Sequence, residues 1–85
     1  MSEDHATAIK RLRIRSWRRG TKEMDMILGP FSDKKLAELG PEEFSEYEML
    51  LNENDQDLYA WFSLSRAVPK HFAPILNRIR QFHGL

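Results

Sequence analysis

The chain has 85 residues, no cysteine, and 13 basic against 13 acidic side chains, so its formal net charge is zero. This length fits one domain with a modest core. The absence of cysteine excludes a disulfide framework, a thiolate metal site and a cysteine nucleophile. No apolar run approaches the ~18 residues of a membrane span, and the polar start is neither a signal nor a transit peptide. We therefore expect a single domain over 1–85, with 1–5 as a disordered tail, in the bacterial cytoplasm.

The zero net charge hides two segments of opposite sign. Basic side chains gather between residues 10 and 22, at Lys10, Arg11, Arg13, Arg15, Arg18, Arg19 and Lys22. Acidic side chains fill residues 38 to 57, where no Lys or Arg occurs, at Glu38, Glu42, Glu43, Glu46, Glu48, Glu53, Asp55 and Asp57. This separation predicts either pairing between the segments or a charged face for a protein partner.

The first expected helix spans residues 6–19, is rich in arginine and carries only a thin apolar stripe. Such a helix lies on the surface, with its cationic side chains over apolar neighbours. Trp17 allows two interpretations, a half-buried anchor or an exposed aromatic at a binding face. An arginine-rich helix with a tryptophan also fits RNA binding, but the central acids would repel phosphate.

A charged corner follows at residues 18–25. Gly20 is expected to end the first helix at positive φ. Arg18 and Arg19 then lie in the last turn of that helix, while Glu23 and Asp25 lie in the first turn of the next, where the helix dipoles favour their charges. By spacing alone, these residues would only end one helix and begin the next, with their charges exposed to solvent.

The second helix is expected to begin near Thr21, with Met24, Ile27, Leu28 and Phe31 on its buried face. The pair at residues 29–30, Gly-Pro, predicts a break or kink, because proline lacks the amide hydrogen and disfavours helical geometry in the preceding residue. A separate third segment would then span about 30–39.

The remaining pattern is also helical. Pro41 suits the first position of a helix, Asp55 is a candidate N-cap for the next, and Trp61 is expected in the core. Residues 71–83 form the clearest amphipathic stripe. No segment alternates with a period of two, so the fold class is all-α, a small single-domain bundle of four to five short helices.

No catalytic or metal-binding pattern is present. His5, His71 and His83 are dispersed, and the chain has neither a phosphate-binding glycine loop nor a nucleophile elbow. Without paired histidines or cysteines, a metal site is not expected. We predict that the chain is not an enzyme and binds no cofactor tightly.

The run Arg18-Arg19-Gly20-x-x-Glu23-x-Asp25 resembles the signature of the SdhE family, whose members are small helical assembly factors. A second motif, at residues 54–61 (Asn-Asp-Gln-Asp-Leu-Tyr-Ala-Trp), resembles the family's acidic turn. The resemblance covers about residues 10–83. One departure is Gln56, where relatives often have proline.

The resemblance implies binding to the flavoprotein subunit of succinate dehydrogenase or fumarate reductase. It also implies that the chain promotes covalent attachment of FAD to that subunit. FAD would then be a cofactor of the partner, and this chain a monomer when free, without nucleic-acid or membrane partners. We predict that the signature residues contact the partner, namely Arg18, Arg19, Gly20, Glu23 and Asp25. Glu23 and Asp25 would either accept hydrogen bonds from the partner or hold Arg18 and Arg19 in place. We expect Gly20→Arg to leave the helices intact and to abolish the attachment of FAD to the partner. An RNA-binding module and a small adaptor for an unrelated protein are the alternatives.

Overall fold

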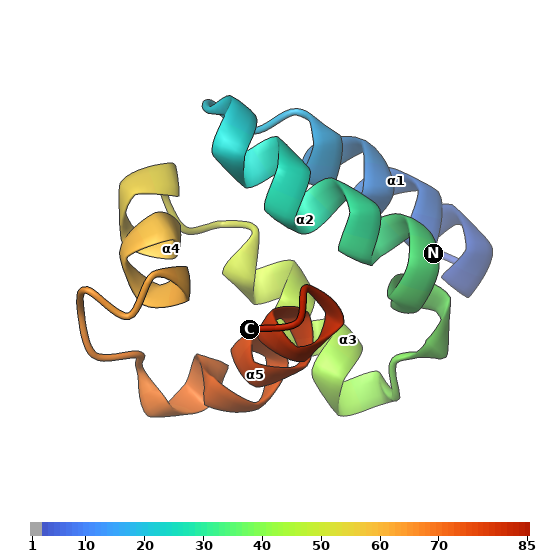
Figure 1. Ribbon diagram of the computed structural model, residues 1–85. Coiled ribbons are helices and arrows are strands. Elements are labelled where there is room, and N and C mark those ends of the chain that lie inside the picture. Colours follow the sequence, from blue (N-terminus) through green and yellow to red (C-terminus); the bar gives the residue numbers. More distant parts are fainter. Residues whose placement is uncertain (1–2) are drawn as a thin grey trace.

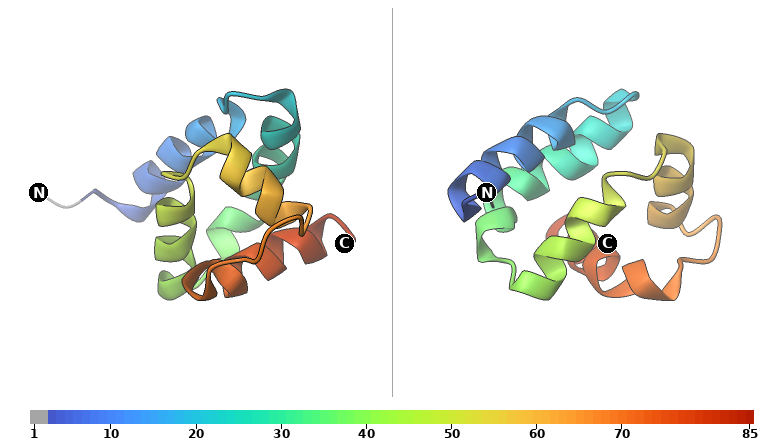
Figure 2. Two further views of the ribbon diagram at one scale, coloured as in Figure 1. Left: turned by 90° about the vertical axis from the view of Figure 1, so that its left-hand side faces the viewer. Right: turned by 180° about the vertical axis from the view of Figure 1, so that it is seen from behind.

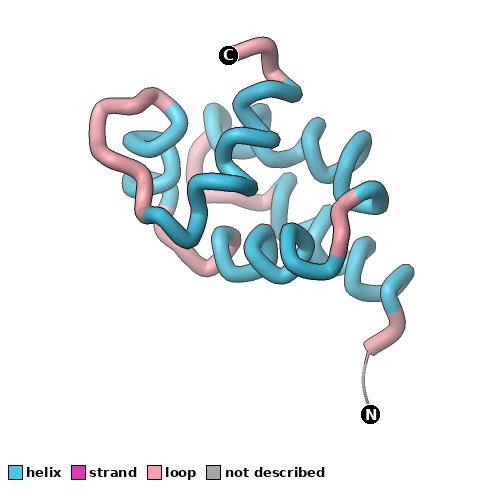
Figure 3. The backbone as a smooth tube through the Cα atoms, turned by 90° about the horizontal axis from the view of Figure 1, so that it is seen from below, coloured by secondary structure: helices cyan, strands magenta, loops and turns pink. Residues whose placement is uncertain are grey.

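The computed structural model describes residues 3–85 and contains helices and connecting loops over that range. The helices are α1 (His5–Trp17), α2 (Lys22–Lys35), α3 (Pro41–Leu50), α4 (Asp55–Phe62) and α5 (Ala73–Phe82), with short 3-10 turns η1 (Leu36–Glu38) and η2 (Lys70–Phe72). The tube in Figure 3 follows this succession of helix and loop from end to end. The prediction of a small all-α bundle is confirmed for the described residues. None of their helices is long and apolar enough to cross a membrane.

The helices form two layers with α4 at one end. Figure 1 shows α1 and α2 side by side across the top, with α3 and α5 crossing below them. The two turned views in Figure 2 agree, and place α4 beside the end of the molecule at which α1 passes into α2. The contacts between elements match this picture, since α2 packs on α1, α4 and α5, and α5 also packs on α3. The turn from α1 to α2 therefore lies close to the start of α4.

Local signals fix the helix starts. The side chain of Asp4 caps α1 by accepting a hydrogen bond from the Thr7 amide at 2.7 Å, and Thr21 caps α2. Pro41 takes the first turn of α3 as predicted. The cap of α4 is Asn54, which accepts from the Asp57 amide at 2.8 Å, so the assignment of Asp55 as the cap is wrong by one residue.

Order begins earlier than the sequence predicts. Met1 and Ser2 lie outside the described residues. Glu3 pairs with Arg11 at 2.9 Å, and His5 is already the first residue of α1. At the other end, α1 stops at Trp17 rather than Arg19, with Arg18 as its C-cap.

The predicted break at residues 29–30 is wrong, because α2 continues through Pro30 to Lys35. Met24, Leu28 and Phe31 follow one another at i, i+4 and i+7, and all three are buried. This continuous face reaches the core only if the helix continues. Burial of these three side chains offsets the cost of a proline inside a helix, about 3 kcal/mol.

One core joins all five helices. Its buried apolar side chains include Leu12, Met24, Leu28, Phe31, Leu36, Tyr47, Leu50, Leu58, Trp61, Phe62, Phe72, Ile75, Leu76 and Ile79. The predicted core position of Trp61 is confirmed, with 8 % of the residue exposed.

A buried polar network ties α1, α2 and α3 together. The Ser16 hydroxyl donates to the Leu12 carbonyl at 2.7 Å and lies 2.6 Å from the Tyr47 hydroxyl. The Tyr47 hydroxyl also lies 3.4 Å from the Leu28 carbonyl, to which it donates. Because every hydroxyl has a partner, the cost of burying these groups is offset.

Candidate partner-binding site

Arg19 is held inside the molecule by three oxygen atoms from the segment between α3 and α4. Its Nε donates to Asp55 Oδ1 at 2.8 Å. Its two terminal nitrogens donate to the carbonyls of Leu51 at 2.8 Å and of Glu53 at 2.7 Å. Only 11 % of the Arg19 side chain and 17 % of the Asp55 side chain is exposed. The guanidinium therefore fastens the start of α4 to the turn between α1 and α2.

Gly20 is part of the same contact. Its amide donates to Asp55 Oδ2 at 2.5 Å, so one carboxylate accepts from two consecutive residues. A Cβ at Gly20 would lie 2.6 Å from that oxygen. The predicted positive φ is wrong, since among the described glycines only Gly84 has one. Glycine is required here by the close approach of Asp55 and not by backbone conformation.

Asp25 closes the corner from the α2 side. Its Oδ1 accepts from the Arg19 amide at 2.6 Å. The predicted partner-binding residues Arg19, Gly20 and Asp25 are thus brought together, and their polar groups already bond to one another or to the start of α4. We refer to Arg19, Gly20, Asp25 and Asp55 as the corner cluster.

Glu23 and Arg18 differ from the corner cluster. Both side chains are exposed, and neither takes part in a hydrogen bond or ion pair among the described residues. Glu23 stands at the edge of a surface groove of about 680 Å³ between the start of α2 and α4. The groove is lined by Thr21, Glu23, Asp55, Gln56, Tyr59, Ala60, Ser63 and Ser65.

The lining of this groove, the α2–α4 groove, has no basic side chain. Tyr59 forms part of its wall with half of the residue exposed. A carboxylate and a phenol ring at one groove suit a donor-rich or cationic segment of a protein. Neither Tyr59 nor Asp55 was predicted from the sequence to be a partner-binding residue. The available signal was the second motif at 54–61, which contains both.

The basic helix α1 is partly neutralised by the rest of the chain. Arg11 pairs with Glu3 and Glu48, and Arg13 with Asp33 at 3.0 Å. Arg15 donates to Asn52 at 2.9 Å. The predicted pairing between the basic and acidic segments is confirmed for Arg11 and Arg19. The ion pairs of Arg11 and Arg13 reduce the positive charge that α1 offers to an RNA backbone.

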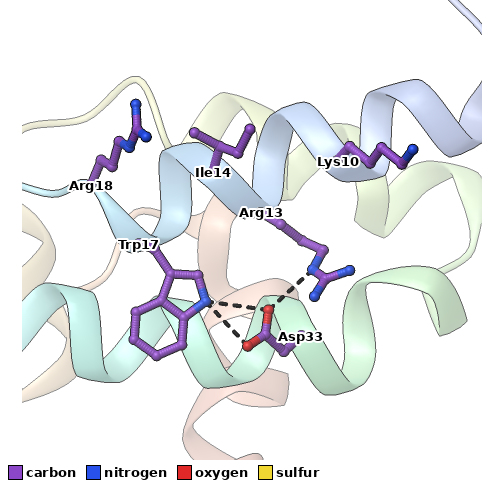
Figure 4. Close-up of a pocket in the computed structure, with 6 residues that line it drawn as sticks. All are labelled: Lys10, Arg13, Ile14, Trp17, Arg18 and Asp33. Atoms are coloured by element: carbon purple, nitrogen blue, oxygen red, sulfur yellow. Dashed lines mark hydrogen bonds and ion pairs between the residues drawn. The ribbon is translucent and has the colours of Figure 1, made fainter.

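Trp17 packs on α2 but keeps part of its surface exposed, and its predicted role at a binding face stays a prediction. Its Nε1 lies 3.2 Å from each carboxylate oxygen of Asp33, and its ring covers Gly29 so closely that a Cβ there would lie 2.7 Å from Cε3. Even so, 40 % of the residue is exposed. Figure 4 shows the indole and Arg13 both directed toward Asp33. Within residues 3–85, no group of three His, Cys, Asp or Glu side chains could hold a metal ion.

These features define a small helical bundle whose candidate site is an open groove beside an internally bonded corner. Residues 10–83 match the model of a protein family described as flavinator of succinate dehydrogenase, and the chain belongs to this family. The SdhE resemblance is thereby confirmed.

Similar proteins include three that are each named succinate dehydrogenase assembly factor 2, mitochondrial. The chain is 36 % identical to the one from Mycosarcoma maydis over 76 residues, which are 89 % of this chain and 32 % of that protein. It is 32 % identical to the one from Cryptococcus neoformans over 81 residues, 93 % and 46 % of the two chains. It is 36 % identical to the one from Candida glabrata over 77 residues, which are 85 % of this chain and 50 % of that protein. The chain thus spans a third to a half of the length of these relatives.

Proposed function

We propose that this protein binds the flavoprotein subunit of succinate dehydrogenase, or of the related fumarate reductase, and promotes covalent attachment of FAD to it. The observation that carries the proposal is the family match over residues 10–83. The three relatives are named as assembly factors of succinate dehydrogenase, which supports the same partner.

In this proposal the chain supplies orientation and no catalytic side chain. The bond to the flavin is made by the chemistry of the flavin and of the flavoprotein, which holds the FAD. The small protein stabilises a conformation of the flavoprotein in which the reacting groups are aligned. Such alignment accelerates a reaction without a contribution from an additional acid or base.

We assign different tasks to the signature residues. The corner cluster fixes α4 against the start of α2 and so sets the width of the α2–α4 groove. Glu23 and Tyr59, which both line this groove, contact the flavoprotein, whereas Arg18 is exposed but lies outside the groove. Support for this division comes from the internal bonds of Arg19 and the exposure of Glu23.

The test is covalent flavin fluorescence of the flavoprotein subunit on a denaturing gel, with and without this protein. Glu23→Ala should lower the rate of flavin attachment and weaken the complex, with an unchanged melting temperature. Glu42→Ala is the matched control, because Glu42 is also exposed in the first turn of its helix but lies outside the groove. It should behave as wild type.

The outcomes separate the two parts of the proposal. If wild-type protein leaves the fluorescence of both flavoproteins unchanged, the assembly function is wrong. If wild type is active and Glu23→Ala equals Glu42→Ala, the function stands but the groove is not the contact site. The bacterial cytoplasm and a monomeric free state stay predictions beside this proposal, and the named relatives are mitochondrial.

A further inference from the structure

A second exposed surface lies on α1, away from the α2–α4 groove. It consists of Lys10, Ile14, Trp17 and Arg18, which we call the α1 surface. They line a hollow of about 490 Å³ together with Arg13 and Asp33. Ile14 is 53 % exposed and Trp17 40 % exposed, which are large values for apolar side chains. None of these four residues lines the α2–α4 groove.

The arrangement of the α1 surface is regular. Lys10 and Ile14 are four residues apart on one face of α1, and Arg18, the C-cap residue, follows them at the end of the helix. Figure 4 shows Ile14 and Arg18 on the side of α1 that faces away from α2, while Trp17 turns toward α2. The two cations lie eight residues apart, about 12 Å along the axis. An apolar centre between two positive ends is the result.

The charges of this surface are free, unlike most of those on α1. Arg11, Arg13 and Arg15 are each bonded to acidic or amide side chains. Lys10 and Arg18 have no ion pair among the described residues. An apolar row with two unpaired cations complements a helix that carries apolar side chains between two carboxylates.

We propose that the α1 surface binds an acidic amphipathic helix of a protein partner. Helix-in-groove recognition of this kind uses apolar anchors spaced by three or four residues, and flanking charges set orientation. A nucleic acid fits less well, because the Asp33 carboxylate in the same hollow repels phosphate and Ile14 offers it no hydrogen bond. The proposal does not rest on the function proposed above.

The probe is a synthetic helical peptide with two glutamates eight residues apart and two leucines between them. It is titrated into the isotopically labelled full chain, and NMR shifts are followed. We expect shifts at the Lys10 and Ile14 amides and the Trp17 indole. A peptide with lysines in place of the glutamates should bind at least about tenfold more weakly.

Matched variants test each half of the surface. Ile14→Ser should weaken binding about fivefold, whereas Met26→Ser, which removes an apolar side chain of equal exposure (54 %) on α2, should not. Lys10→Glu should weaken binding about three- to tenfold, and Lys34→Glu, an exposed control on α2, should not.

Any one of four results would overturn the proposal. The first would be a lysine peptide that binds as tightly as the glutamate peptide. The second would be NMR shifts that lie away from the α1 surface. The third would be Lys10→Glu and Ile14→Ser variants that bind the peptide as tightly as their controls do. The fourth would be a single-stranded RNA oligonucleotide that shifts the same amide resonances and binds with higher affinity than the glutamate peptide. The α1 surface would then bind nucleic acid instead.

Discussion

Arg19 and Asp55 join the two sequence motifs of this chain through one ion pair. Arg19 Nε lies 2.8 Å from Asp55 Oδ1, and both side chains are largely buried. The other oxygen of Asp55 accepts from the Gly20 amide. The first motif, at 18–25, and the second, at 54–61, are thus two halves of one structure, although about 30 residues separate them in the sequence. A change in either half should therefore affect the same property, the position of α4.

Asp55→Ala should lower the free energy of unfolding by about 2–4 kcal/mol, because it leaves the buried Arg19 guanidinium without its carboxylate. This corresponds to a fall in Tm of roughly 10–20 °C. Urea unfolding followed by tryptophan fluorescence measures it. Arg19→Lys should be almost as harmful, since an ammonium cannot reach three acceptors in a plane. Gln56→Ala, an exposed change in the same turn, is the control. If Asp55→Ala lowers the free energy of unfolding no more than Gln56→Ala does, the ion pair between Arg19 and Asp55 does not stabilise the fold.

Gly20→Ala should destabilise the protein by about 1–3 kcal/mol, because its Cβ would displace the Asp55 carboxylate. Gly40→Ala is the matched control, as a Cβ at Gly40 meets nothing within 4 Å. In an Asp55→Ala background the cost at Gly20 should disappear, since the obstructing oxygen is gone. A cost that persists there would show that the backbone, not Asp55, demands glycine. For Gly20→Arg the same geometry leads us to predict a disturbed corner as well as a lost partner contact, in place of the intact helices expected from the sequence.

Sequence patterns predicted most helices because their signals are local. Pro41 marks a helix start, and the buried stripes of α2 and α5 follow the helical period. The two motifs both contribute to the lining of the α2–α4 groove, Glu23 from the first and Tyr59 from the second, but the groove itself was not predicted.

Long-range contacts explain what was missed. Nothing within residues 18–25 shows that Arg19 turns inward, because its three acceptors belong to residues 51–55. The break predicted at Gly29 and Pro30 follows from local rules, and the fold overrides them. Gly29 is needed where the Trp17 ring crosses α2, and the buried face of α2 extends past Pro30.

Gly29→Ala separates these two influences. Helix propensity alone predicts a gain of about 1 kcal/mol, since alanine replaces glycine inside a helix. The Trp17 ring occupies the space of the new Cβ, so we expect a loss of about 1–3 kcal/mol instead. The indole NH resonance should also shift as its bonds to Asp33 break. A stabilised variant with an unmoved indole resonance would place the ring elsewhere.

Tyr47 should make the free energy of unfolding fall as the pH rises above 10. Burial raises the pKa of Tyr47 above its ordinary value of 10.0, and this effect exceeds the opposing effect of its hydrogen bond with Ser16. The folded state therefore keeps the proton more firmly than the unfolded state. The contribution of the Tyr47 hydroxyl to the free energy of unfolding is fully present below pH 10. It is lost as the pH rises from there through the pKa of the folded state, by up to about 1.4 kcal/mol per pH unit.

Tyr47→Phe removes this titration and tests it. At neutral pH the variant should be less stable by about 1 kcal/mol, because the Leu28 carbonyl loses its donor and Ser16 a partner. Above pH 10 the wild type should lose stability faster than the variant, so the difference between them shrinks. Urea unfolding from pH 7 to 11 measures both slopes, and titrations that the two proteins share cancel in the difference. Parallel slopes would mean that the Tyr47 hydroxyl ionises as readily in the folded protein as in the unfolded chain.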